Sequence, residues 1–227
     1  MKWNWLARQG ADRLLVFWNG WGMDERPFAP LLAEGIDVLV LSDFTKVSGQ
    51  DRRDILLEMG PVEHYRERVL LAWSMGVWAA HTLFNGYSTI FQRKIAVNGT
   101  LCPIHDSYGI SRKIFSATAL NWSDPARKKF YRRMCGEKQL TDRFTANEPA
   151  RSVEDQRQEL DWYLDSVSCS LAEESFFDEA WVSRKDKIMV TENQLNFWGS
   201  DVQLLDGGHF PFYQKQSWSE LLQLPNK

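Results

Sequence analysis

The chain has 227 residues, of which 44% are hydrophobic and 25% charged, and its formal net charge is −3. This apolar content is enough for one sizeable core, which excludes a wholly disordered chain. The negative net charge argues against a general nucleic-acid binder. No apolar run approaches the roughly 18 residues of a membrane span, and the first residues do not look like a secretory signal peptide. We therefore expect a soluble, cytoplasmic protein without nucleic-acid or membrane partners.

The three cysteines, Cys102, Cys135 and Cys169, are odd in number and show no Cys-x-x-Cys spacing. Such a scattered set predicts reduced thiols rather than a disulfide framework or a zinc site.

Six short apolar runs end in small or polar residues, as the buried strands of an α/β sheet do. They span residues 14–18, 38–41, 69–73, 95–98, 180–183 and 202–205. Residues 3–6 alternate weakly and favour an edge strand, whereas residues 75–84, 193–198 and 216–224 favour helices. Strands that alternate with helices predict a mostly parallel sheet covered on both faces.

The stretch from residue 102 to residue 174 contains only helical patterns. Ser152 and Asp155 have the spacing of a helix cap, and apolar residues then recur at helical intervals: Leu160, Tyr163, Leu164, Val167 and Leu171. We expect a helical lid over residues 102–174, inserted into a core made of residues 1–101 and 175–227.

The third apolar run leads into Ala72-Trp73-Ser74-Met75-Gly76 and then into a helical pattern. This segment fits the Gly-x-Ser-x-Gly nucleophile elbow, with alanine at the first glycine position. Small residues are needed there because the strand and helix backbones pass close together. The sharp turn would expose the Ser74 hydroxyl at a helix N-terminus, where the Met75 N–H can face an oxyanion. An ordinary strand–helix turn is the alternative interpretation.

A second oxyanion donor is expected in the loop after an earlier strand. The sequence there is Asn19-Gly20-Trp21-Gly22, which resembles the His-Gly-x-Gly loop common in the α/β-hydrolase fold, with asparagine for histidine. The glycines permit positive φ and close backbone approach, so we expect the Trp21 N–H to be the second donor. A plain turn is the alternative.

A serine nucleophile needs a base to take its proton. We expect this base to be His209, which follows the last predicted strand in a Gly-Gly-His loop. The order serine, acid, histidine along the chain also selects it among the four histidines. The acid is expected after the preceding strand, where Asp186 stands. Glu192 and Asp206 are weaker candidates. The sequence thus predicts an α/β-hydrolase fold with a triad of Ser74, Asp186 and His209, although a loop residue in solvent is the alternative for each of the last two.

The predicted lid is basic between residues 111 and 143, where nine Lys or Arg residues outnumber three Asp or Glu residues. A basic patch beside the site of an acidic protein favours an acidic macromolecular substrate. A solvated helix face is the alternative. Four aromatic residues interleave with these charges and line an acyl channel or form the core of the lid: Phe115, Trp122, Phe130 and Tyr131.

Several segments together resemble the BioG-type branch of the pimeloyl-[acyl-carrier protein] methyl ester esterases. They are the Gly20-Trp21-Gly22 loop, the elbow up to Trp78, and residues 96–100, 132–136 and 180–188, so the resemblance covers nearly the whole chain. It implies a cytoplasmic α/β-hydrolase that cleaves the methyl ester of pimeloyl on acyl-carrier protein in biotin synthesis. It implies no metal and no organic cofactor.

The resemblance also implies roles for particular residues. The residues expected to contact the ester end of the substrate are Trp21, Ser74, Met75 and His209. Phe130 is expected to contact the acyl chain. The residues expected to contact the acidic carrier protein are Arg127, Arg132 and Arg133. Two alternatives stay open. One is another small-ester carboxylesterase or thioesterase of the same fold, and the other is a hydrolase-like binding module without turnover.

Overall fold

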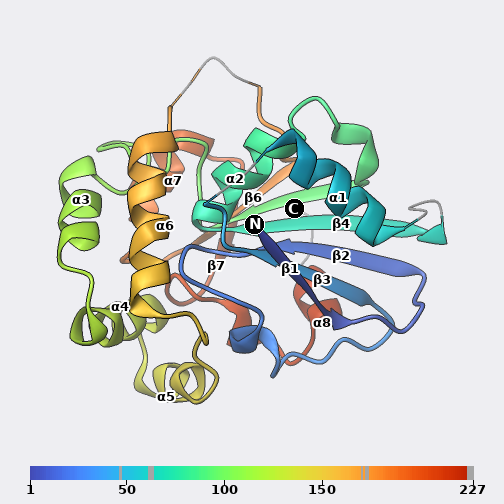
Figure 1. Ribbon diagram of the computed structural model, residues 1–227, viewed down its shortest axis with the longest axis horizontal. Helices are drawn as coiled ribbons and strands as arrows, with labels where there is room; N and C mark the ends of the chain where they lie inside the picture. Colours follow the sequence, from blue (N-terminus) through green and yellow to red (C-terminus); the bar gives the residue numbers. More distant parts are fainter. Residues whose placement is uncertain (46–47, 61–63, 170, 172–173, 224–227) are drawn as a thin grey trace.

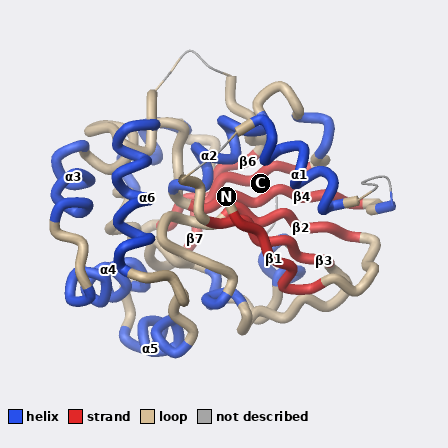
Figure 2. Tube along the Cα trace, in the orientation of Figure 1, coloured by secondary structure: helices blue, strands red, loops and turns tan. Residues whose placement is uncertain are grey.

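A seven-stranded sheet forms the centre of the computed structural model, which describes residues 1–45, 48–60, 64–169, 171 and 174–223. The order of the strands is β1-β3-β2-β4-β5-β6-β7. β1 pairs antiparallel with β3 at one edge, and the other neighbouring strands pair in parallel. The prediction of a mostly parallel sheet with helices on both faces is confirmed (Figure 2). The strands are β1 Lys2–Ala7, β2 Arg13–Trp18, β3 Asp37–Ser42, β4 Glu67–Trp73, β5 Arg93–Val97, β6 Glu179–Ser183 and β7 Gln203–Leu205.

Burial on both faces explains why the strands read as continuous apolar runs. In β2, Leu14, Val16 and Trp18 belong to one core cluster, while Leu15 and Phe17 belong to another. Successive side chains of a strand point to opposite faces, so each cluster lies on its own side of the sheet.

Short helices cover the two faces (Figure 1). Helices α1 (Gly49–Met59) and α2 (Met75–Phe84) contribute to the first cluster, whereas the short helices η1 (Arg26–Phe28) and α8 (Trp218–Leu222) contribute to the second. Helix α7 (Thr191–Trp198) packs against β6. Of the helix predicted over residues 216–224, the structure has α8, and residue 224 lies outside the described residues.

Four helices lie between β5 and β6, and we call them the helical segment: α3 Arg112–Leu120, α4 Asp124–Cys135, α5 Lys138–Ala146 and α6 Val153–Ser166. They stand together beside the sheet, at the left of Figure 1. Helix α6 begins with a capping box between Ser152 and Asp155, as its sequence predicts. It ends at Ser166 because Val167 has extended dihedral angles, so the apolar pattern that runs on to Leu171 extends beyond the helix. Within the predicted lid range, residues 170, 172 and 173 lie outside the described residues.

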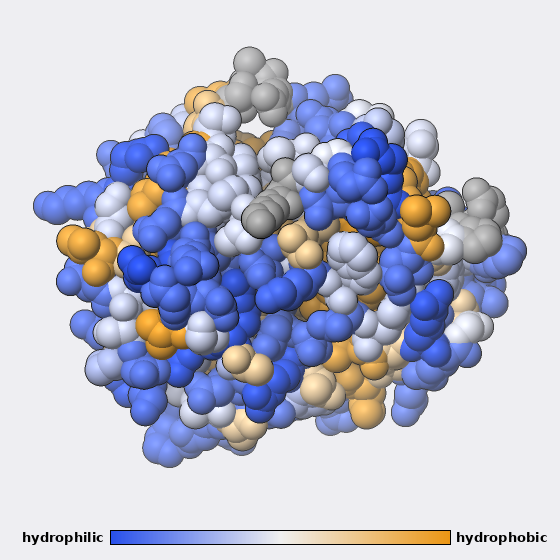
Figure 3. Space-filling view, viewed as in Figure 1, coloured by the Kyte–Doolittle hydropathy of each residue, from blue (hydrophilic) through white to orange (hydrophobic). Residues whose placement is uncertain are grey.

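The surface of the protein is mostly polar on the face that Figure 1 views. The face seen in Figure 3 is mostly hydrophilic, with hydrophobic side chains scattered over it. Among the described helices, none has both the length and the apolar character needed to cross a bilayer.

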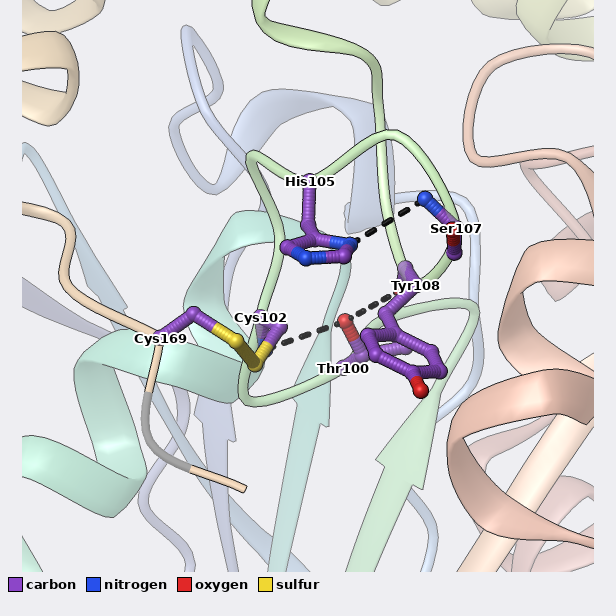
Figure 4. Close-up of a disulfide and its surroundings, with 6 residues drawn as sticks. All are labelled: Thr100, Cys102, His105, Ser107, Tyr108 and Cys169. Atoms are coloured by element: carbon purple, nitrogen blue, oxygen red, sulfur yellow. Dashed lines mark hydrogen bonds between the residues drawn. A yellow bond between two sulfur atoms is a disulfide. The ribbon is translucent and has the colours of Figure 1, made fainter.

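The cysteines are not all reduced, so that prediction is wrong for two of the three. Cys102 and Cys169 form a disulfide with a Cα–Cα distance of 4.6 Å (Figure 4). Cys135 is a buried free thiol. Cys102 precedes the helical segment and Cys169 follows it, so the bond joins the chain on either side of the four helices. Sequence spacing cannot reveal this pairing, because the two residues are 67 positions apart and meet only in the folded chain.

We predict that unfolded, unreduced protein reacts with a thiol reagent at one cysteine, and at three cysteines after reduction. Reduction is also expected to lower the free energy of unfolding by up to about 4 kcal/mol, because a long closed loop loses its constraint in the unfolded state. Thiol titration and denaturant melts measure both effects. A Cys135→Ala variant serves as the control, with no reactive thiol before reduction and two after it. Three reactive thiols in the unreduced wild type would contradict the prediction.

Candidate active site

Ser74 occupies a tight turn between β4 and α2. Its φ is 58°, a left-handed conformation that is uncommon for a residue with a side chain and is found where structure stores strain for function. Its N–H donates to the Val97 carbonyl at 2.9 Å. The turn needs Gly76, because a Cβ atom there would lie 2.2 Å from the backbone oxygen of Asn19 at the end of β2. The sequence motif therefore reflects close packing of backbone on backbone.

Ser74, His209 and Asp186 form a buried chain of hydrogen bonds. His209 Nε2 lies 2.8 Å from Ser74 Oγ, and His209 Nδ1 lies 2.7 Å from Asp186 Oδ2. The exposed fractions of the three residues are 6%, 1% and 4%. The structure brings together the three residues that the sequence singles out, and each follows the C-terminal end of a parallel strand, where sites of open α/β sheets form.

The Asp186 carboxylate is held at both oxygens. Oδ1 accepts the N–H groups of Ile188 at 2.8 Å and Met189 at 3.1 Å, and Oδ2 accepts the side-chain amide of Gln194 at 2.9 Å as well as the His209 ring. These bonds leave the carboxylate one orientation toward the imidazole. The two weaker acid candidates lie elsewhere: Asp206 is exposed near Arg184, and Glu192 is in the first turn of α7.

The backbone of His209 is fixed from two neighbouring strands. Its carbonyl accepts the Trp73 indole N–H at 2.8 Å and the Asn98 amide at 3.0 Å. Asn98 also donates to Ser183 Oγ at 2.8 Å and accepts the Ser183 N–H at 2.7 Å. Sequence reasoning missed Asn98 as a site residue, although a polar residue at the end of a predicted buried strand was a usable signal.

The loop after β2 lies against Ser74. A Cβ atom added to Gly20 would lie 3.3 Å from the Ser74 Cβ. The fully buried Asn19 side chain closes the loop on itself, because it accepts the Gly20 N–H at 2.9 Å and donates to the Asp24 carbonyl at 2.8 Å. On the other side of Ser74, Met75 is the first residue of α2, where an N–H has no partner within its helix.

A cavity of about 280 Å³ opens from Ser74 and His209 between the sheet and the helical segment. Two residues of the predicted ester end, Trp21 and Met75, also line it, as does Phe130, whose ring lies 5.1 Å from that of Trp21. Further apolar side chains extend the lining: Met23, Phe115, Met134, Leu160 and Ile188. The lining is mostly apolar, as is typical of pockets that bind small molecules.

Nearly the whole chain matches one protein family. The family model for the pimeloyl-ACP methyl esterase BioG matches residues 1–221. The chain belongs to the BioG family. The solved structure of BioG from Haemophilus influenzae is 30% identical to it, with a TM-score of 0.81, over 97% of this chain and 99% of that one. A lipase-esterase related protein from Clostridium acetobutylicum, at 12% identity, covers 99% of both chains with a TM-score of 0.69 and shows likeness of fold only.

A longer relative carries a different name. The malonyl-[acyl-carrier protein] O-methyltransferase of Bacteroides fragilis is 32% identical over 200 residues, which are 86% of this chain but only 39% of that protein. The topology and the two solved structures confirm the α/β-hydrolase fold, and the family is one of hydrolases.

The basic residues that the BioG resemblance selects differ in their surroundings. Arg133 is exposed, lines the cavity and donates to the Lys187 carbonyl at 2.7 Å, while Arg132 is exposed on the same helix, α4. Arg127 is largely covered and pairs with Asp124 at 2.7 Å.

Among the described residues, no group of three or more His, Cys, Asp or Glu side chains is arranged to hold a metal.

We predict that Gly76→Ala lowers the free energy of unfolding by about 1–3 kcal/mol, because the new methyl group meets the Asn19 backbone and forces β2 and α2 apart. Thermal and denaturant melts measure the change. The matched control is Gly49→Ala at the first residue of α1, where an added Cβ would have no neighbour within 4 Å and stability should not fall. Equal stability of the two variants would show that the elbow tolerates a side chain at residue 76.

Proposed function

We propose that this protein hydrolyses the methyl ester of pimeloyl-[acyl-carrier protein], yielding pimeloyl-[acyl-carrier protein] and methanol in biotin biosynthesis in the cytoplasm. The observation that carries the proposal is the buried hydrogen-bond chain from Asp186 through His209 to Ser74, which opens on an apolar cavity in a chain of the BioG family. The family description names this substrate, and the geometry supports the chemistry.

In the first half of the reaction, His209 Nε2 takes the proton of the Ser74 hydroxyl as Ser74 Oγ attacks the ester carbonyl. Asp186 keeps the ring in the required tautomer and stabilises the imidazolium. The N–H groups of Trp21 and Met75 hold the oxyanion. His209 then gives its proton to the methoxy oxygen, and methanol leaves an acyl-enzyme on Ser74.

In the second half, His209 takes a proton from water, whose oxygen attacks the acyl carbonyl. Collapse of this second tetrahedral intermediate returns the proton to Ser74 and frees the distal carboxylate of the pimeloyl chain. A carboxylate is costly to keep in an apolar cavity, so the charge created by the reaction favours release of the product.

We further propose that residues 102–174 act as a lid with two contacts to substrate. Phe130 and its apolar neighbours would hold the methylene chain. Basic side chains of α4 would meet the acidic carrier protein, with Arg127, Arg132 and Arg133 as the first candidates. Arg127 is the weakest of the three, because its side chain already serves Asp124 and the Arg151 carbonyl.

The Bacteroides relative raises methyl transfer as a second candidate, since its name is that of a methyltransferase. We assign that activity to the part of the relative outside the match, because the matched 39% corresponds to this chain, which has an α/β-hydrolase fold and a serine elbow. Incubation with malonyl-carrier protein and a sulfonium methyl donor should therefore produce no methyl ester.

Ser74→Ala is expected to reduce kcat for pimeloyl-carrier-protein methyl ester at least about a thousandfold, because the attacking oxygen is lost. Mass spectrometry of the carrier protein measures the loss of the methyl group. Thr118→Val, which removes another hydroxyl from the same cavity, should keep most of the wild-type rate. Equal rates for Ser74→Ala and the wild type would overturn the proposed function.

Arg132→Ala combined with Arg133→Ala is expected to raise KM for the carrier-bound ester at least about tenfold and to leave a free pimelate methyl ester unaffected. The control, Arg8→Ala with Arg53→Ala, removes the same charge from two exposed sites, one just after β1 and one on α1, and neither residue lines the cavity. Equal losses on both esters, or no loss on either, would contradict docking through α4.

A further inference from the structure

Helix α6 of the helical segment holds the loop that follows β2. The Gly22 N–H donates to Glu159 Oε2 at 2.9 Å, and Gln156 Nε2 donates to the Gly22 carbonyl at 2.8 Å. The Trp21 indole N–H donates to the backbone carbonyl of Gln156 at 2.8 Å. Gln156 and Glu159 are three residues apart and therefore share one face of the helix. Two residues of α6 thus bind both polar groups of the Gly22 backbone and the neighbouring side chain.

Glu159 is buried in a way that is costly unless every oxygen is satisfied. Its exposed fraction is 0%, and its second oxygen accepts the N–H of Phe44, in the loop after β3, at 3.1 Å. Burial raises the pKa of Glu159, while the Arg151 guanidinium, which binds the same carboxylate, opposes that shift. Arg151 also pairs with Asp43 at 3.4 Å. Buried ion pairs add little net stability over apolar packing, so stability alone does not account for this one.

The amide of Gln156 has one orientation. Its exposed fraction is 1%, its oxygen accepts the Trp122 indole N–H at 3.2 Å, and its nitrogen faces the Gly22 carbonyl and the Tyr131 hydroxyl, the latter at 3.2 Å. Since the amide nitrogen is the only donor of the side chain, these neighbours fix which end faces Gly22.

Gly22 needs such restraint because its φ of 74° lies in a region where glycine moves freely. Peptide units are planar, so holding the N–H and the carbonyl of Gly22 fixes the two peptide planes on either side of it. The bound indole fixes Trp21 from its side chain. Together these bonds limit rotation at Trp21, whose N–H would otherwise turn with the loop.

We propose that Glu159 and Gln156 are positioning residues of the oxyanion hole, which hold the Trp21 N–H in the direction that the tetrahedral intermediate requires. This inference rests on the proposed function, in which the Trp21 N–H binds the oxyanion. It assigns to α6 a part in the chemical step, apart from any part of the helical segment in substrate docking.

The experiment compares Gln156→Leu and Glu159→Gln with two matched controls on the same helix, Gln158→Leu and Glu154→Gln, whose wild-type side chains are exposed. We expect kcat of the first two to fall about tenfold to hundredfold, with KM within about twofold of wild type, because an oxyanion donor acts in the transition state. The loss should be equal for the carrier-bound ester and a small free methyl ester. The controls should match the wild type.

A second readout separates positioning from a general loss of structure. A methyl trifluoromethyl ketone, which forms a tetrahedral adduct with Ser74, should lose affinity in Gln156→Leu by the same factor as kcat. Melting temperatures identify the variants that fold. If Glu159→Gln does not fold, Gln156→Leu alone tests the inference, because it replaces an uncharged side chain.

A folded Gln156→Leu with wild-type kcat and wild-type affinity for the ketone would overturn this inference alone, and so would a change in KM without a change in kcat. A wild type without Ser74-dependent hydrolysis would instead overturn the proposed function, and this inference with it.

Discussion

The close approach of three backbone segments around Ser74 is the constraint on which the rest of the site depends. A Cβ atom at Gly76 would lie 2.2 Å from the backbone oxygen of Asn19, and one at Gly99 would lie 2.4 Å from the backbone oxygen of Ser74. The elbow is therefore packed directly between the end of β2 and the loop after β5. This contact places the serine beside the loop that carries Trp21 and at the N-terminus of α2, where the partial positive charge of the helix lies.

Around this contact the structure forms a connected set of buried hydrogen bonds. Asp186 is held by backbone N–H groups and by Gln194, and the His209 backbone is held by Trp73 and Asn98. Each bond fixes a group that would otherwise rotate, so the imidazole meets Ser74 without rearrangement. Preorganisation of this kind is what allows a low-dielectric site to stabilise developing charge, because little reorganisation remains to be done during the reaction.

The helical segment contributes more than a cover for the cavity. Phe130 and its neighbours form one wall, and Gln156 and Glu159 bind the loop after β2. The disulfide between Cys102 and Cys169 joins the chain on either side of the helical segment, which limits how far the segment can move from the sheet. A displacement of α6 would break its bonds to Gly22, so the position of the helical segment is mechanically coupled to the shape of the loop after β2.

The sequence by itself determined the parallel sheet, the elbow at Ser74 and the order in which Asp186 and His209 follow it. Those features are written in local patterns, namely apolar runs, small residues at a tight turn, and polar residues where strands end. Only the tertiary structure decided that Cys102 meets Cys169 and that Glu159 binds the Gly22 backbone, across 67 and 137 positions respectively. No local pattern encodes such pairs, because their partners are a thiol and a backbone N–H that any fold could bring near. They become specific only when the strands have placed the loops and the helical segment has packed against them.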